Sequence, residues 1–142
     1  MTAGTTALAG PDQRPRTLVN RVNERAQAQP DLVAMRVKRL GIWRDITWAE
    51  YADNVSLVGH ALLSLGVAPG DRVAVHSENR PEWLFADLGT IAVRGITVGL
   101  YPTNPAAEVA YLLRDSGSKV LVAEDQEQVD KALEVERDCP DL

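Results

Sequence analysis

Three short runs rich in β-branched residues constrain the fold of this chain more than any other feature. They span residues 72–76, 96–100 and 119–123, and two helical patterns separate them. Each helical pattern opens with a proline, Pro81 or Pro105, at the expected first helical position. Alternating strands and helices form right-handed crossovers and a mainly parallel sheet that is covered on both faces. The sequence therefore predicts an α/β fold in which six strand residues are buried, namely Val73, Val75, Ile96, Val98, Val120 and Val122.

The region before these runs predicts a helix followed by a small β-hairpin. Thr17 is placed to cap a first helix that ends before Pro30. Residues 33–37 then alternate between apolar and polar side chains, which is typical of a half-buried strand. Gly41 supplies a turn, and residues 42–47 form the expected partner strand.

A longer helix follows the hairpin and carries the clearest local signal in the chain. Thr47 and Glu50 have the spacing of a capping box, in which each side chain accepts a hydrogen bond from a backbone N–H of the other residue. Apolar residues at helical spacing continue from there to Gly66, the expected left-handed stop. A charged helix is also predicted over residues 125–138, after Gly117 has closed the helix before the third strand.

Composition narrows the class of protein. With 142 residues, 45% of them hydrophobic and 25% charged, the chain suits one soluble domain, which we assign to residues 17–142 after a flexible tail over residues 1–16. The net charge of −5 argues against a dedicated nucleic-acid binder. No secretory signal and no run of about 20 apolar residues is present. Cys139 is the single cysteine, which excludes an internal disulfide and fits a cytoplasmic protein.

Two polar segments follow predicted strands and open helices. They cover residues 77–83 and 100–105, at the sheet edge where open α/β proteins bind ligands. Free N–H groups at a helix N-terminus suit an anion or a carboxylate. For Trp83 and Asn104 we favour structural roles, as a core residue and an N-cap. His76 ends a strand at the same edge, whereas His60 lies within a helix, and neither has a metal or base partner evident in the sequence.

The same segments carry a resemblance to a known family. The runs ITWAEY, LGVAPGDRVAV, SENRPEW and TVGLYPTNPAAEVAYLLRDSGSKVLV, followed by EDQEQVDK, resemble the start of long-chain fatty-acyl-CoA synthetases. These are AMP-forming ligases of the adenylate-forming superfamily, and the resemblance covers nearly everything but the tail. It implies the N-terminal part of the large adenylating domain of such an enzyme.

The resemblance also implies an activity, its ligands and its partners. In this family a fatty acid reacts with Mg-ATP to give an acyl-adenylate, and CoA then displaces AMP. The resemblance also implies two further interactions. The parent enzyme is expected to contact a membrane peripherally, and the chain is expected to self-associate or to form a homodimer. By position, six residues are expected to border the acyl or CoA cleft, namely Asn79, Arg80, Trp83, Tyr101, Thr103 and Asn104.

The family's catalytic motifs do not occur in this chain. The phosphate loop, the Mg-binding Glu, the ribose-binding Asp and the C-terminal Lys are all missing, so no catalytic residue and no metal ligand is predicted. We therefore expect this chain alone to be inactive. Two alternatives stay open: a ligase for a short-chain, aromatic or amino acid, and a stand-alone α/β binding module. A phospho-receiver is disfavoured, because Ser77 rather than an acidic cluster follows the first strand.

Overall fold

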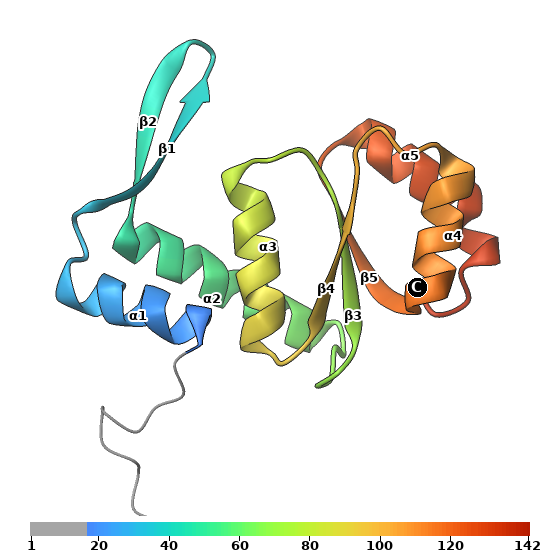
Figure 1. The fold of residues 1–142 in the computed structure, drawn as a ribbon, viewed down its shortest axis with the longest axis horizontal. Helices are drawn as coiled ribbons and strands as arrows, with labels where there is room; N and C mark the ends of the chain where they lie inside the picture. Colours follow the sequence, from blue (N-terminus) through green and yellow to red (C-terminus); the bar gives the residue numbers. More distant parts are fainter. Residues whose placement is uncertain (1–16) are drawn as a thin grey trace, which may run out of the picture.

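The computed structural model describes residues 17–142, so the predicted tail over residues 1–16 lies outside the described residues. A helix, a hairpin and a second helix precede an alternating run of strands and helices (Figure 1). The elements are α1 (Leu18–Ala28), β1 (Val33–Arg39), β2 (Ile42–Thr47), α2 (Trp48–Ser64), β3 (Arg72–His76), α3 (Pro81–Ala92), β4 (Ile96–Leu100), α4 (Ala106–Ser116), β5 (Ser118–Ala123), α5 (Gln126–Val135) and a 3-10 turn (Glu136–Asp138). No helix within residues 17–142 is long and apolar enough to cross a bilayer.

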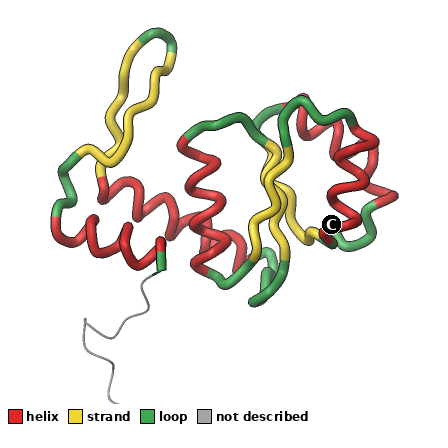
Figure 2. The backbone as a smooth tube through the Cα atoms, in the orientation of Figure 1, coloured by secondary structure: helices red, strands yellow, loops and turns green. Residues whose placement is uncertain are grey.

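The three central strands form a parallel sheet in the order β4-β3-β5. The β1–β2 hairpin is a separate antiparallel pair. Because the strands are parallel, their carboxyl ends meet at one edge, and the loops after β3 and β4 run along that edge at the top of Figure 2. The predicted α/β fold, with a mainly parallel sheet, flanking helices and a small hairpin, is confirmed.

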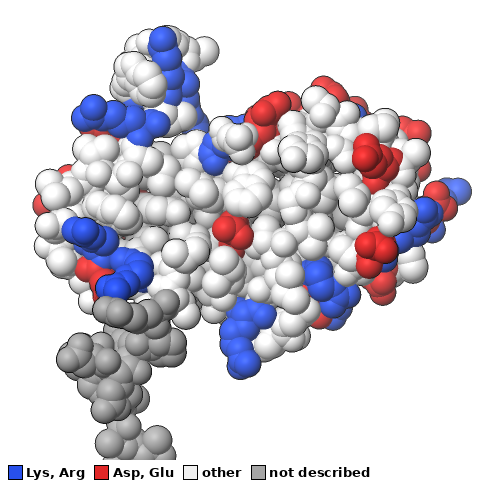
Figure 3. Space-filling view, viewed as in Figure 1, with Lys and Arg blue, Asp and Glu red and all other residues white. Residues whose placement is uncertain are grey.

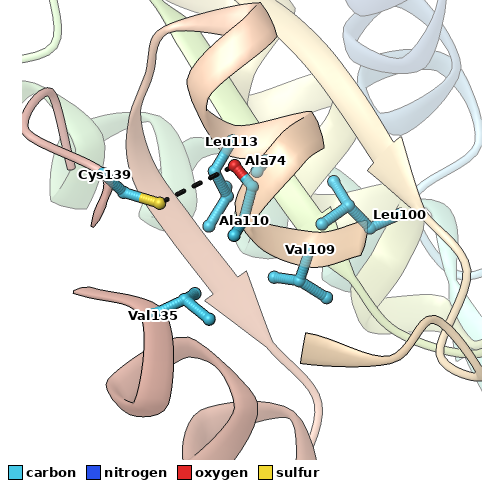
Figure 4. Packing of buried hydrophobic residues seen from close by; sticks show 7 residues of the cluster. All are labelled: Ala74, Leu100, Val109, Ala110, Leu113, Val135 and Cys139. Carbon is cyan, nitrogen blue, oxygen red and sulfur yellow. Dashed lines mark hydrogen bonds between the residues drawn. The ribbon is translucent and has the colours of Figure 1, made fainter. Parts of the chain in front are cut away.

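One face of the sheet packs against α4 and α5. Its core contains Ala74, Leu100, Val109, Ala110, Leu113, Val135 and Cys139 (Figure 4). The Cys139 thiol lies 3.9 Å from the carbonyl oxygen of Ala110, and burial raises the pKa of this thiol. Cys139 is therefore a core residue of this layer, held as a neutral thiol.

The opposite face packs against α2 and α3, which also carry α1 and the hairpin. Val73 is fully buried beneath Leu62 and Val67. Beyond α3, a second cluster joins α1, α2 and α3, and in it the rings of Tyr51 and Phe85 lie 5.7 Å apart. The hairpin is thus attached through the helical layer rather than through the sheet.

Four of the predicted helix ends, at Thr17, Thr47, Gly66 and Gly117, are confirmed. The Glu50 N–H donates to Thr47 Oγ1 at 3.2 Å, and the Thr47 N–H donates to Glu50 Oε2 at 2.8 Å, which completes the capping box. Thr17 Oγ1 caps α1 by accepting from the Asn20 N–H at 3.2 Å. Gly66 and Gly117 follow α2 and α4 with φ angles of 83° and 59°, left-handed values that favour glycine.

Some predictions were wrong in detail. Ile96 is 53% exposed rather than buried, because it begins a strand with one edge unpaired among the described residues. Val98, Val120 and Val122 are only partly buried. Pro105 is the N-cap of α4, not its first residue. The last predicted helix tightens into a 3-10 turn after Val135.

Candidate functional site

The carboxyl edge of the sheet brings together three loops that are far apart in sequence. Residues 77–80 follow β3, residues 101–105 follow β4, and Glu124 follows β5. The Glu124 N–H donates to the carbonyl oxygen of His76 at 3.1 Å, so the ends of β3 and β5 are joined directly. This edge is where ligands bind in open α/β sheets, and both predicted polar segments lie along it.

Glu124 organises the loop after β3. One carboxylate oxygen accepts from the Glu78 N–H at 2.7 Å and from Ser77 Oγ at 3.2 Å. The other accepts from Arg80 Nη1 at 2.7 Å. The Glu78 N–H above all, with Ser77 and Arg80, lowers the pKa of Glu124 despite partial burial, so this carboxylate is ionised at neutral pH.

Arg80 connects Glu124 to a second carboxylate. Its Nε donates to Glu82 Oε2 at 2.9 Å, and Arg39 of the hairpin pairs with the other oxygen of Glu82. Burial opposes ionisation of Glu82, but the hydrogen bond from Arg80 and the two nearby cations outweigh it, so the pKa of Glu82 is lowered. In turn, Glu82 and then Glu124 raise the pKa of Arg80. The result is a chain of alternating charges that runs from the hairpin, across the start of α3, to the end of β5.

Three of the six predicted cleft residues line one hollow. Asn79, Trp83 and Tyr101 surround a space of about 310 Å³, together with the backbone region of Gly99. Trp83 is half-buried rather than a core residue, so the structural role that we favoured for it was wrong. A Cβ at Gly99 would come within 3.5 Å of its indole ring, which shows how closely that ring approaches β4.

The other three predicted residues have different surroundings. Arg80 lines two neighbouring hollows, one of about 160 Å³ beside Glu124 and one of about 500 Å³ beneath the hairpin. Thr103 is exposed and Asn104 is buried, and neither lines these three hollows. Asn104 is not an N-cap, because Pro105 occupies that position; its N–H instead donates to the Tyr101 carbonyl at 3.0 Å.

His76 is fully buried beneath the same edge. Its Nε2 donates to the Tyr101 carbonyl oxygen at 3.1 Å, which fixes the loop after β4, while Nδ1 has no protein partner within residues 17–142. Burial lowers the pKa of His76, so the ring is neutral at pH 7. His60 is exposed on α2, with its ring 2.8 Å from the Ser56 carbonyl oxygen. Among the described residues, no three His, Cys, Asp or Glu side chains cluster in a way that would hold a metal ion.

Glu124, Glu82 and Arg39 were missed by the sequence-based prediction. Glu124 could have been found, because it directly follows a predicted strand and so reaches the same carboxyl edge as the two polar segments. Glu82 lay inside the segment 77–83 but was not singled out. Nothing in the sequence pairs it with Arg39, because that contact depends on how the hairpin folds over α3.

Comparison with known proteins identifies the family. The sequence profile of the family described as AMP-binding enzyme matches residues 22–142. The chain belongs to this family. The long-chain-fatty-acid–CoA ligase FadD15 of Mycobacterium bovis is 36% identical over 121 residues, which cover 85% of this chain and 20% of that protein. The chain therefore spans about a fifth of the length of the curated relatives that it matches.

Solved structures of AMP-binding enzymes share the fold. The N-terminal domain of FACL13 from Mycobacterium tuberculosis superposes with a TM-score of 0.71 at 26% identity, over 84% of this chain and 28% of that one. Acetoacetyl-CoA synthetase from Streptomyces lividans gives a TM-score of 0.73 at 27% identity, over 87% of this chain and 21% of that one. The parallel sheet, its helices and the hairpin thus match the N-terminal domain of adenylate-forming enzymes.

Proposed function

We propose that this AMP-binding segment serves an enzyme that activates a long-chain fatty acid with ATP and transfers the acyl group to CoA. In the first step the carboxylate oxygen attacks the α-phosphate, and pyrophosphate leaves. In the second step the CoA thiol attacks the acyl carbon, and AMP leaves. The observation that carries the proposal is the family match over residues 22–142 together with relatives named as long-chain-fatty-acid–CoA ligases.

Within that function, we assign the carboxyl edge of the sheet to the wall of the acyl or CoA cleft. Asn79, Trp83 and Tyr101 support the assignment best, because they line one hollow that combines an indole ring and a phenol ring with an amide. Arg80 lines the two neighbouring hollows, from a position held by Glu82 and Glu124. Thr103 and Asn104 stay in the proposal through their place in the same loop.

We place the catalytic centre of the adenylation outside residues 17–142. ATP and Mg²⁺ require a phosphate-binding loop and carboxylate ligands, and residues 17–142 contain no cluster that suits the metal. We therefore assign no catalytic residue and no metal ligand to residues 17–142. The role of this chain in the proposal is to position a wall of the substrate cleft, in a cytoplasmic enzyme.

The test is exchange of labelled pyrophosphate into ATP in the presence of a long-chain fatty acid. We expect no exchange with residues 1–142 alone, and clear exchange with a version extended to the length of its relatives. Losing even one electrostatic contact to the reacting phosphate typically lowers the rate about 100- to 1,000-fold, and we expect residues 1–142 to make none of these contacts. Exchange by the chain alone would show that the active site lies within residues 1–142, contrary to the proposal.

A second candidate is an adenylate-forming ligase for another carboxylate. The fold and 27% identity shared with acetoacetyl-CoA synthetase favour it. Running the same exchange assay on the extended protein with fatty, aromatic and short-chain acids separates the two candidates. Activity confined to a short-chain or aromatic acid would agree with the family but would show that the long-chain substrate is wrong.

A further inference from the structure

A tight turn follows β4 and leads into α4. The Asn104 N–H donates to the Tyr101 carbonyl oxygen at 3.0 Å, which closes a β-turn with Pro102 at its second position. Proline suits that position because its ring presets the backbone. Tyr101 belongs to none of the buried apolar clusters of residues 17–142. The place of the Tyr101 ring in the hollow therefore depends on how the backbone of this turn is held.

His76 anchors the turn from the end of β3. Its side chain is fully buried, and its Nε2 donates to the Tyr101 carbonyl oxygen at 3.1 Å. Burial above all lowers the pKa of His76, so the ring is neutral and carries its one proton on Nε2, the nitrogen that faces the carbonyl. The Tyr101 carbonyl thus accepts two hydrogen bonds, one from within the turn and one from the central strand of the sheet.

Lys131 anchors the next carbonyl from α5. Its Nζ donates to the Pro102 carbonyl oxygen at 3.0 Å and to Glu127 at 2.7 Å. Glu127, Asp130 and Glu134 make α5 acidic, and Lys131 is its single cation. Figure 3 shows Asp and Glu gathered at the upper right, where α4 and α5 lie in Figure 1. The Lys131 side chain is nevertheless only 19% exposed, so this cation is directed at the turn rather than into solvent.

The two anchors are not required by the regular structure around them. β4 ends at Leu100 and α4 begins at Ala106, so the carbonyls of Tyr101 and Pro102 belong to neither element. Burial of His76 also has a cost, because its Nδ1 has no protein partner among the described residues. An apolar residue would fill the end of β3 without that cost. The hydrogen bond to the turn is what the histidine provides in return.

We propose that His76 and Lys131 are positioning residues for substrate binding, which hold two successive carbonyls and so set the Tyr101 ring in the wall of the substrate cleft. The inference rests on the proposed function, in which Tyr101 lines that wall with Asn79 and Trp83. His76 and Lys131 act through the turn and not on the reacting atoms. If the turn is released, the apparent affinity falls with the fraction of molecules whose wall is in place. Saturating substrate draws the turn back, so kcat is preserved.

The test is steady-state thioester formation by the extended protein, with the fatty acid and CoA varied in turn. His76→Leu removes the donor at similar volume, and Lys131→Met removes the ammonium but keeps the apolar stem. Each lost hydrogen bond should shift the equilibrium between the held and the released turn by about fivefold. We expect the KM for the fatty acid or for CoA to rise several-fold, and further in the double variant, with kcat within about twofold of the parent.

Conservative variants and matched controls separate positioning from general loss of stability. His76→Gln and Lys131→Arg restore an N–H donor and should return KM close to the parent value. Lys119→Met removes the same charge at the opposite edge of the sheet, where Lys119 donates to Asp71 at 2.9 Å, and should leave both KM values unchanged. Leu113→Ala, in the core near the C-terminal end of α4, should lower the melting temperature without changing KM.

Hydrogen exchange followed by mass spectrometry reports the turn directly. In peptides that cover residues 101–106 of the extended protein, exchange should be faster in His76→Leu and in Lys131→Met than in the parent. It should match the parent in Lys119→Met. If His76→Leu does not fold, Lys131→Met tests the same turn from a side chain outside the core.

Several results would overturn the proposal. One is an active parent whose KM values do not change in the double variant, which refutes this inference alone. Others are a lower kcat at unchanged KM, an equal rise of KM in Lys119→Met or Leu113→Ala, and a KM in His76→Gln as high as in His76→Leu. An extended parent protein that is inactive on every carboxylate would refute the proposed function, and this inference with it.

Discussion

Removal of the Glu124 carboxylate should destabilise the chain by about 2 kcal/mol. The side chain is 19% exposed and accepts from the Glu78 N–H, Ser77 Oγ and Arg80. Hydrogen bonds to a charged group are worth about 1.5–3 kcal/mol each when buried. The total loss of stability is smaller than the sum of three such bonds, because two of the donors keep another acceptor in the variant. Ser77 Oγ keeps a 2.9 Å bond to the Glu78 carbonyl, and Arg80 keeps its bond to Glu82.

The measurement is the unfolding of Glu124→Ala by urea and by heat, each monitored by far-UV circular dichroism. A loss of about 2 kcal/mol corresponds to a fall in melting temperature of roughly 6 °C for a chain of this size. Glu108→Ala, an exposed carboxylate in the first turn of α4, is the control and should change the free energy of unfolding by less than about 0.5 kcal/mol. If Glu124→Ala and Glu108→Ala unfold at the same urea concentration, Glu124 does not organise this edge.

Two further predictions concern the cap of α2 and the buried histidine. Thr47→Ala should lower the free energy of unfolding by about 1 kcal/mol, because Thr47 Oγ1 no longer accepts from the Glu50 N–H; an unchanged urea midpoint would contradict this. Stability should fall as the pH drops below about 6.5, because burial depresses the pKa of His76 in the folded state and the unfolded chain binds the proton first. The dependence of the free energy of unfolding on pH should persist in His60→Gln and disappear in His76→Gln. If the stability of the parent does not change below about pH 6.5, His76 is not the group that titrates.

The element order could be predicted because its signals are local. The capping box at Thr47 and Glu50, the glycine at position 117 and the three β-branched runs each act through neighbouring residues, and the structure confirms them. The burial of Ile96 could not be predicted in this manner. Whether a strand residue is covered depends on which strand lies beside it, and an alternating pattern does not show that β4 is an outer strand.

The candidate site was predicted by position rather than by contact. The rule that ligands gather at the carboxyl edge selected residues 77–83 and 100–105, and three of the named side chains do line one hollow. Asn104 was predicted to be the N-cap of α4, but the N-cap position is occupied by Pro105. The ion pairs that hold this edge could not be predicted, because Arg80 meets a carboxylate 44 residues away and Arg39 meets one 43 residues away.

The central position of β3 has a consequence for synthesis of the protein. β3 precedes both of its partners in the chain, yet its apolar residues Val73, Ala74 and Val75 are fully buried. While a ribosome adds residues at about 5–20 per second, this apolar strand waits on the order of seconds before β5 has been made. The helical cluster of α1, α2 and α3 needs no such delay. We therefore expect β3 to be the segment of the nascent chain that a holding chaperone protects.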